Sequence, residues 1–471
     1  MWERVKTGIL LVLILISFQL TRMFWMRVGA QVSLVVSPAG PTLPAGDTTP
    51  ASYLDLYAPL HIYVHKGANH YQLRTPDQQY SEAWQAIKDA LTKIEGSDPN
   101  QAQQFAAVGL SEWQQALSNS LELRYSGQVE LNYWWLASGK SSIWRFSEQP
   151  LFFDRVAIPL QDNSIFFRNL ETEQVWRWQW SADQNLSLLP GVDQLAFGAA
   201  QRVRALQVPE GITVVPAAGL YTYQEPIALP EILVAPPFRT ADKSRIVRQF
   251  FSITPRMPRT DTLETGEVIE SFITAKQQVL SLSNTGRLEY KETESTGGSS
   301  TITEQFEQAF NFIDTHGGWP RSVLADGIKK VGTDANGFEF SFVQLHQGYP
   351  LIDLNPSTLA VQVAPDGVRS YLRKIYRIVQ PGYFPYEVRT PEQALQSLDG
   401  ELGSRRVTDI YLGYYQRDFA PLNSEKPFDA EPTYLFPVWV IKLNTGEHLL
   451  LHAFNLMNDP GVILPQSSDN W

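Results

Sequence analysis

The longest unbroken apolar stretch of the chain lies close to its N-terminus. Residues 8–20 carry no charge, and apolar side chains continue past Arg22 to Met26. A helix over the 19 residues from Gly8 to Met26 is about 28 Å long at ~1.5 Å per residue, which matches the ~30 Å hydrocarbon core of a bilayer. The pattern predicts a single membrane-spanning helix that is retained. A cleaved signal peptide ending at Ala30 is the alternative.

After this segment, apolar and polar positions alternate over short runs, a pattern typical of strands with one buried face. Residues 37–52 are rich in Pro, Gly, Ala and Thr and have no apolar period, which favours a linker. Such breaks divide the chain into five predicted parts: 1–29, cytoplasmic tail and transmembrane helix; 30–52, Pro/Gly-rich linker; 53–216, N-terminal ectodomain; 227–296, central β-rich domain; and 301–465, C-terminal α+β domain.

The N-terminal ectodomain combines helices with several strands. Apolar residues at steps of three and four predict a helix that ends at Gly96: Trp84, Ile87, Leu91 and Ile94. A second, shorter helix carries Trp113 and Leu117. The predicted strands are 60–65, 121–125, 129–136, 154–160, 165–168 and 175–180. The central domain has glycine turns at Thr265-Gly266 and Asn284-Thr285-Gly286, which separate strands predicted at 247–253, 268–274, 278–283 and 287–292.

The C-terminal domain contains an internal repeat. Each unit begins with the residues of a capping box, Thr301 with Glu304 and Thr390 with Gln393, followed by a short helix and about three antiparallel strands. The strands are predicted at 338–345, 359–363, 368–379, 407–414, 434–443 and 447–454. The predicted fold class is therefore α+β: a single N-terminal transmembrane helix followed by a multi-domain ectodomain of antiparallel sheets, with helices packed on one face.

Composition narrows the function classes. The net charge of −11 repels phosphate backbones and anionic lipid, so nucleic acid is disfavoured as a partner and membrane attachment must be hydrophobic. The aromatic content of 12% favours sheet-rich structure. The absence of cysteine excludes disulfides, thiolate metal sites, iron–sulfur clusters and a cysteine nucleophile.

Three of the histidines are close enough in sequence to be candidate metal ligands. His61 and His65 share a predicted strand face with Tyr63, so a metal pair is geometrically allowed, with His70 close in sequence. No nearby carboxylate or cysteine supplies a third ligand, and ordinary packed or surface histidines are the favoured interpretation. The same holds for the histidines at 448 and 452, while His316 marks a helix end before two glycines. We predict no metal site and no cofactor.

Signatures of catalysis are missing. The sequence lacks Gly-x-Ser-x-Gly, Ser-x-x-Lys and His-Glu-x-x-His. Gly139-Lys140-Ser141 resembles the end of a phosphate loop, but Trp134 stands where the loop needs glycine. We therefore predict no catalytic residues, no small-molecule substrate and no enzymatic activity.

Two sets of residues are candidates for binding partners. Polar residues near one face of the membrane helix can hydrogen-bond to another helix, although bonding to their own backbone is the alternative: Ser17, Gln19 and Thr21. Alternating tryptophans on a predicted strand form a candidate partner face in the ectodomain: Trp176, Trp178 and Trp180. A sheet core against the Trp84 helix is the favoured interpretation of these rings, and glycan stacking is a further alternative.

The order of several short motifs resembles the YycH family of extracytoplasmic regulators of the WalK sensor kinase in Gram-positive bacteria. The resemblance begins with the basic tail and apolar helix from Arg4 to Trp25 and is clearest from Val247 to Phe454. The C-terminal domain also looks like YycI and PepSY-type modules. The motifs are Phe306-x-x-Ala309-Phe310-x-Phe312-Ile313, His316-Gly317-Gly318-Trp319, Gly348-Tyr349-Pro350-Leu351, Asp366-Gly367-Val368-x-x-Tyr371 and Pro437-Val438-Trp439-Val440.

This resemblance implies a cell-membrane protein with one pass, its N-terminus cytoplasmic and its C-terminal ectodomain extracellular. It further implies contact with a YycI-like regulator through the ectodomain and with a WalK-like histidine kinase through the helix, as part of the WalK/WalR two-component system. The family supplies no catalytic residue set. Two other functions stay open: an exported cell-wall glycan-binding protein or hydrolase using the Trp-rich first domain, and a secreted PepSY-like protease inhibitor.

Overall fold

The computed structural model describes residues 53–93, 105–131, 134, 150–179, 200–238, 243–251, 255, 258–263, 267–292, 300–331, 337–353, 357–398, 402–416, 428, 432–454 and 462–463. The predicted membrane segment, the linker, Trp180 and the Gly139-Lys140-Ser141 turn lie outside these residues. Within them, no helix combines the length and the apolar character needed to cross a bilayer. The described residues belong to one unit, Leu43–Trp471.

The first half of this unit forms a nine-stranded antiparallel sheet in the order β3-β7-β6-β5-β4-β1-β2-β8-β9. Helix α3 (Gln78–Lys93) follows β2 and buries Trp84, Ile87 and Leu91, as its apolar spacing predicts. The short helices are α2 (Tyr53–Leu56) and α4 (Leu110–Ala116). The strands are β1 (His61–Lys66), β2 (Asn69–Arg74), β3 (Phe105–Ala107), β4 (Asn119–Glu130), β5 (Phe152–Pro159), β6 (Ser164–Arg168), β7 (Val175–Gln179), β8 (Gln201–Ala205) and β9 (Tyr221–Tyr223).

The second half forms a fifteen-stranded sheet, in which the described strands pair antiparallel except β17 with β21. Its strands are β10 (Ala228–Ala235), β11 (Arg259–Thr262), β12 (Val268–Ile273), β13 (Gln278–Ser283), β14 (Arg287–Glu292), β15 (Val323–Val331), β16 (Gly337–His346), β17 (Tyr349–Ile352), β18 (Leu359–Ala364), β19 (Gly367–Lys374), β20 (Arg377–Glu387), β21 (Val407–Gln416), β22 (Thr433–Leu443), β23 (His448–His452) and β24 (Val462–Ile463).

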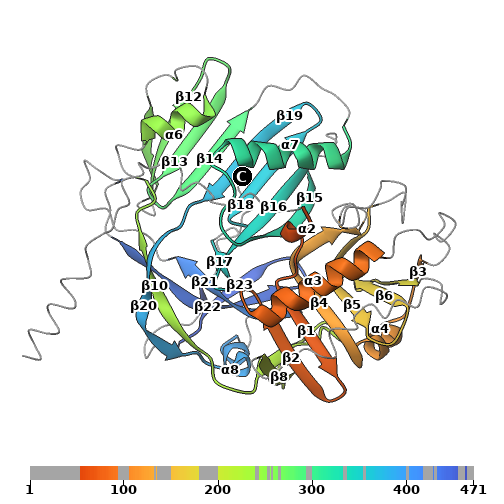
Figure 1. The fold of residues 1–471 in the computed structure, drawn as a ribbon. Coiled ribbons are helices and arrows are strands. Elements are labelled where there is room, and N and C mark those ends of the chain that lie inside the picture. Colours follow the sequence, from red (N-terminus) through yellow and green to blue (C-terminus); the bar gives the residue numbers. More distant parts are fainter. Residues whose placement is uncertain are drawn as a thin grey trace, which may run out of the picture. The chain divides into compact units, whose positions relative to one another are not determined.

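Both predicted capping boxes are confirmed. Thr301 caps α7 (Ile302–Thr315) with Glu304 as the reciprocal partner, and Thr390 caps α8 (Pro391–Gln396) with Gln393. Helix α7 lies across β16, β18 and β19 (Figure 1) and buries Phe306, Ala309 and Ile313. Helix α8 buries Ala394 and Leu395 in a second core that includes Trp439 of β22.

One predicted element is wrong. Residues 247–253 were assigned to a strand, but Lys243–Phe250 form helix α6, whose buried residues are Ile246, Val247 and Phe250. These three positions follow the helical steps of one, three and four, while Lys243, Arg245 and Arg248 supply the polar remainder of the helix. Strands β10 and β15 lacked a prediction, and the strand predicted at 368–379 is divided between β19 and the first residues of β20.

The two sheets share one hydrophobic core and meet where β4 approaches β15. The core cluster includes Leu123 of β4 and Phe340 of β16. At the approach of β4 to β15, Ser126 donates its hydroxyl to the carbonyl of Ala325 at 3.2 Å. Strands β12–β14, from the predicted central domain, continue through the β14–β19 pairing into the predicted C-terminal domain. The observed class is thus mostly antiparallel sheet with few helices.

Candidate functional site: a buried charge network

Strand β4 places charged side chains in the interior of the protein, because other elements cover both of its faces. Its odd-numbered residues Leu121, Leu123 and Tyr125 lie in the hydrophobic core. The alternate residues Glu122 and Arg124 project to the opposite face, since side chains of a strand alternate. That face is buried as well, and the exposed fractions of Glu122 and Arg124 are 1% and 2%. A buried charge at either position therefore needs a partner.

The register of the nine-stranded sheet places basic residues in a row across five strands. Cross-strand partners share a face and lie close together, so their side chains interact directly. Arg74 pairs with His61, His61 with Arg124, Arg124 with Arg155, and Arg155 with Arg168. Like charges set side by side in this way repel each other unless anions lie between them.

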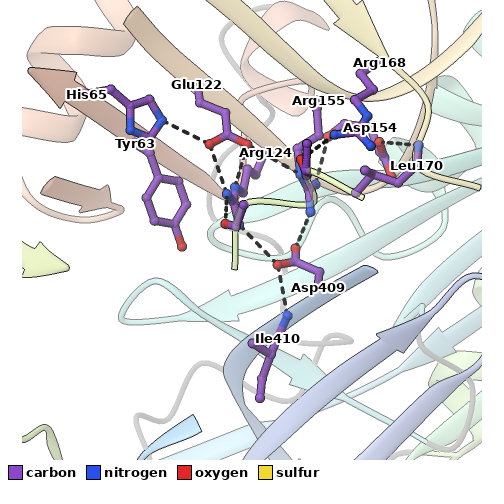
Figure 2. A network of polar contacts seen from close by, with 12 residues as sticks. Tyr63, His65, Glu122, Arg124, Asp154, Arg155, Arg168, Leu170, Asp409 and Ile410 are labelled. Carbon is purple, nitrogen blue, oxygen red and sulfur yellow. Dashed lines mark hydrogen bonds and ion pairs between the residues drawn. The ribbon is translucent and has the colours of Figure 1, made fainter. Parts of the chain in front are cut away.

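Two carboxylates neutralise the centre of this basic row. Arg124 donates through Nε to Oε1 of Glu122 and through Nη2 to Oε2, both at 3.0 Å, in a two-pronged pair. Asp409, from β21 of the other sheet, accepts from Arg155 Nη2 at 2.7 Å and from Arg124 Nη1 at 3.4 Å. Figure 2 shows Asp409 reaching from its own strand toward both guanidinium groups. One carboxylate thus links the two sheets.

Arg168 ends the row and is held by backbone oxygens. Its guanidinium donates to the carbonyls of Pro216 and Ala217. The Trp113 ring centroid lies 5.7 Å from the Arg168 Cζ. Ala217 has a positive φ of 51°, which turns the loop so that successive carbonyls face this side chain. Burial lowers the pKa of Arg168 to about 10, which leaves the group charged at neutral pH.

Aromatic rings and a buried acid complete the site. The Arg124 Cζ lies 4.2 Å from the Tyr63 ring centroid and 5.0 Å from that of Tyr221, a favourable placement for a desolvated cation. Asp154, beside the row, accepts from the backbone N–H of Leu170 at 3.2 Å. Burial raises the pKa of Asp154, because the charged form loses its hydration there.

The neighbouring charges keep Glu122 and Asp409 ionised. Burial alone would raise the pKa of Glu122, but Arg124 and His65 outweigh it and lower that pKa to about 2. Burial likewise opposes ionisation of Asp409, and Arg155 and Arg124 overcome it, so its pKa is lowered. Burial disfavours the cationic form of His61 and lowers its pKa to about 3, so this histidine is neutral at pH 7.

A small polar cavity adjoins the network where β4, β15, β21 and β22 come together. It measures about 100 Å³. Its lining includes Asp154, Asp326, Lys442 and His448, together with Gly127 at the β4–β15 approach. Lys442 donates to the carbonyl of Ser126, which adds another bond between the two sheets. Burial lowers the pKa of His448 to about 4, so this histidine is neutral at pH 7.

The predicted geometry at the histidines is confirmed in part. His61, Tyr63 and His65 share one face, with the Tyr63 ring centroid 6.1 Å from that of His61 and 6.4 Å from that of His65. His316 stands at the end of α7, as predicted, with its Nδ1 2.9 Å from the carbonyl oxygen of Phe312. Among the described ranges, no group of three or more His, Cys, Asp or Glu side chains is arranged to hold a metal ion.

The two described tryptophans of the predicted partner face, Trp176 and Trp178, do not form an open aromatic surface. Trp178 is buried with an exposed fraction of 1%, and Trp176 packs partly buried against the same core. The buried ring of Trp178 offers no surface for stacking on sugars or for docking a partner, and Trp180 lies outside the described residues. The polar face of the membrane helix, Ser17, Gln19 and Thr21, lies outside the described residues.

Sequence reasoning missed the charge network. Glu122 and Arg124 fall inside a predicted strand, and a charged pair within an otherwise apolar strand is the signal that was available. Asp409 and Arg155 are far away along the chain, and only the register and the packing of two sheets bring all four residues together.

Comparison with known proteins agrees with this architecture. No protein-family model matches the sequence, and no curated protein matches it. The crystal structure of YycH from Bacillus subtilis superimposes with a TM-score of 0.52 at 12% sequence identity, covering 86% of this chain and 98% of that chain. This chain has the YycH fold. An uncharacterised protein from Eubacterium rectale aligns with a TM-score of only 0.32 at 11% identity, over 54% of this chain and 89% of its own.

The YycH fold was expected from the motif order, and the structural likeness confirms that expectation. It covers 86% of this chain and therefore extends into the N-terminal ectodomain, where no motif was matched. At 12% identity the likeness establishes the fold, and the charge network is described from this chain's own side chains.

Proposed function

We propose that this protein is a membrane-anchored, extracytoplasmic regulator of a sensor histidine kinase. The observation that carries the proposal is the YycH fold, shared with a protein of which 98% is covered. The uncharged apolar stretch at residues 8–20, preceded by Arg4 and Lys6, supports a single N-terminal anchor with the basic tail in the cytoplasm.

The buried network supports a role in binding rather than in catalysis. Glu122 and Asp409 are ionised, paired with arginines and buried, so neither is placed to meet a substrate. Catalytic acids and bases need access to a reacting group. In the proposed function the network holds two sheets in one arrangement and thereby fixes the surface that faces a partner.

Regulation would follow from unequal contacts with two states of the kinase. A bound protein shifts a conformational equilibrium only as far as it binds one state more tightly than the other. The proposed contacts are the polar face of the membrane helix toward a WalK-like kinase, and the ectodomain toward a YycI-like regulator. The proposed location is the cell membrane, with the ectodomain outside.

Co-purification from membranes tests the proposal. Tagged full-length protein, solubilised in mild detergent, is expected to recover a membrane histidine kinase. Replacement of Ser17, Gln19 and Thr21 together by Leu is expected to reduce that recovery severalfold, because interhelical hydrogen bonds contribute roughly 0.6–2 kcal/mol each. The matched control replaces three apolar residues by Leu and keeps the helix equally hydrophobic: Ile9, Val12 and Ile16.

Two results would contradict the proposal. Equal kinase recovery by the triple variant and by the wild type would remove the polar-face contact. A mature protein found free in the medium and starting at Gln31 would remove the anchor and favour a secreted protein instead.

A further inference from the structure

A pair of histidines lies beside the charge network, and one of them, His65, contacts Glu122. His65 of β1 stands directly opposite His70 of β2 in the hairpin register. Their Nδ1 atoms are 2.9 Å apart, a hydrogen-bond distance, so the two rings turn the same nitrogen toward each other. His65 is buried, whereas His70 is partly exposed and opens the position to solvent.

We propose that His65 and His70 form a binding site for a divalent transition-metal ion, with Zn²⁺ as the reference ion. Two imidazole nitrogens on a tetrahedral zinc ion, each ~2.0–2.1 Å from the metal, lie about 3.3 Å apart. The observed separation of 2.9 Å therefore needs an opening of only a few tenths of an ångström. The neutral imidazole nitrogen is the commonest metal ligand among side chains.

The hydrogen bonds around His65 prepare it as a ligand. Its Nε2 lies 3.1 Å from Oε2 of Glu122, and a carboxylate oxygen accepts hydrogen bonds, so this contact places the imidazole proton on Nε2. With the proton on Nε2, Nδ1 of His65 offers its lone pair toward His70. Arg124 holds Glu122 through two hydrogen bonds and so fixes the orientation of the imidazole.

This arrangement is the one that metal-binding histidines commonly show, in which the outer ring nitrogen donates to a carboxylate. In the metal-free protein, one proton bridges the two Nδ1 atoms. A metal ion takes the place of that proton, which moves to Nε2 of His70, so His70 stays a neutral imidazole and no net proton is released. Binding thus needs no rearrangement of the charge network.

The surroundings limit the site to two protein ligands. The ring of Tyr221 lies beside both histidines, with centroids 5.7 Å from His65 and 5.5 Å from His70. No third histidine or carboxylate completes a ligand group among the residues that the structure describes. Water fills the remaining coordination positions, so the ion exchanges freely and binds more weakly than in closed structural sites.

Calorimetric titration of Zn²⁺ into metal-free, full-length protein in detergent at pH 7.5 tests the site. The wild type is expected to bind one ion per chain with a micromolar dissociation constant. The substitutions His65→Gln and His70→Gln are each expected to weaken binding at least tenfold. His346→Gln is the matched control, because His346 is also partly exposed and lies on a strand of the other sheet, and wild-type binding is expected.

A second measurement on the unaltered protein guards against variants that fail to fold. Electron paramagnetic resonance of the protein with one equivalent of Cu²⁺ is expected to show coupling to two imidazole nitrogens. Zinc binding that is equally strong in His70→Gln and wild type would overturn the site. A copper spectrum without imidazole nitrogens would overturn it as well.

Discussion

At the scale of single residues, the main feature is a basic row that depends on two acids. Taking a charge out of water costs several kcal/mol per ion, and only close partners offset that cost. Glu122 and Asp409 supply those partners for Arg124 and Arg155, with contacts between 2.7 and 3.4 Å. Asp409 matters more than Glu122 for holding the two sheets together, because it comes from the other sheet.

Replacement of Asp409 by Asn is expected to destabilise the protein by about 3–5 kcal/mol, since it leaves the charge of Arg155 buried without its nearest carboxylate. Urea unfolding followed by circular dichroism measures the change. The control is Asp261→Asn, which removes an exposed pair with Arg259 and is expected to change the free energy by less than about 0.5 kcal/mol. Equal midpoints for the two variants would contradict the role of Asp409.

His61 predicts an acid-sensitive stability. Its pKa is about 3 in the folded protein and near 6.5 when unfolded, because burial disfavours the cation, with Asp409 opposing and Arg124, Arg74 and Arg155 adding to the effect. The unfolded chain therefore binds the proton first, and stability falls as the pH falls from about 6.5 toward 3.

The variant His61→Gln is expected to lose less stability on acidification than the wild type. Between pH 7.5 and pH 5 the difference in unfolding free energy between the two proteins should change by about 1–2 kcal/mol in favour of the variant. Urea midpoints at pH 7.5, 6 and 5 provide the measurement. Parallel curves for the two proteins would show that His61 titrates alike in the folded and unfolded states.

At the scale of elements, β4 joins the sheets because one of its residues has no side chain. A Cβ built on Gly127 would lie 1.3 Å from the carbonyl oxygen of Asp326 in β15. That distance is far below any real contact, so the approach of β4 to β15 requires glycine. The bonds from Ser126 to Ala325 and from Lys442 to Ser126 depend on the same approach.

The substitution Gly127→Ala is expected to cost about 3 kcal/mol or more, because backbone must move apart on both strands and the neighbouring bonds are strained. Thermal unfolding measures the loss. Gly109→Ala is the matched control, since its new Cβ would meet only the Ser111 hydroxyl at 3.6 Å, and the cost is expected to stay below about 1 kcal/mol. A Gly127 variant as stable as this control would show that the two strands separate without penalty.

At the scale of the whole molecule, two sheets behave as one folded body because they share a core and a charge network. The core cluster contains Leu123 and Val156 from the first sheet, with Phe340 and Tyr411 from the second. In the order of the described strands, the chain passes from the first sheet to the second between β9 and β10, and the segment that precedes β9 also pairs with β21 through Val214 and Val407. Side-chain packing and this backbone pairing together hold the sheets to each other.

Unfolding of the wild type in urea is expected to be a single transition, with tryptophan fluorescence and far-ultraviolet circular dichroism coinciding. Trp178 in the first sheet and Trp439 in the second report on both parts. Removal of the shared anion by Asp409→Ala is expected to separate the two signals. Two separate transitions already in the wild type would contradict a cooperative pair of sheets.

Local signals made much of this fold predictable. The capping boxes at Thr301 and Thr390 were visible in sequence because a hydroxyl and its partner three residues later act within one helical turn. Helix α6 was mistaken for a strand because its eight residues are too few for either period to dominate. The charge network was not predicted, since β4 and β21 are remote in sequence and strand alternation shows which residues share a face, not what covers that face.

Residue type and short spacing are enough to establish the strand-rich character, the motif order that pointed to the YycH fold and the absence of thiol chemistry. Three features required the folded chain: Arg124 and Arg155 share Asp409, Trp178 is interior, and His65 faces His70 with Glu122 behind it. Pairing and burial are set by strand register and by the docking of two sheets, which involve residues far apart along the chain.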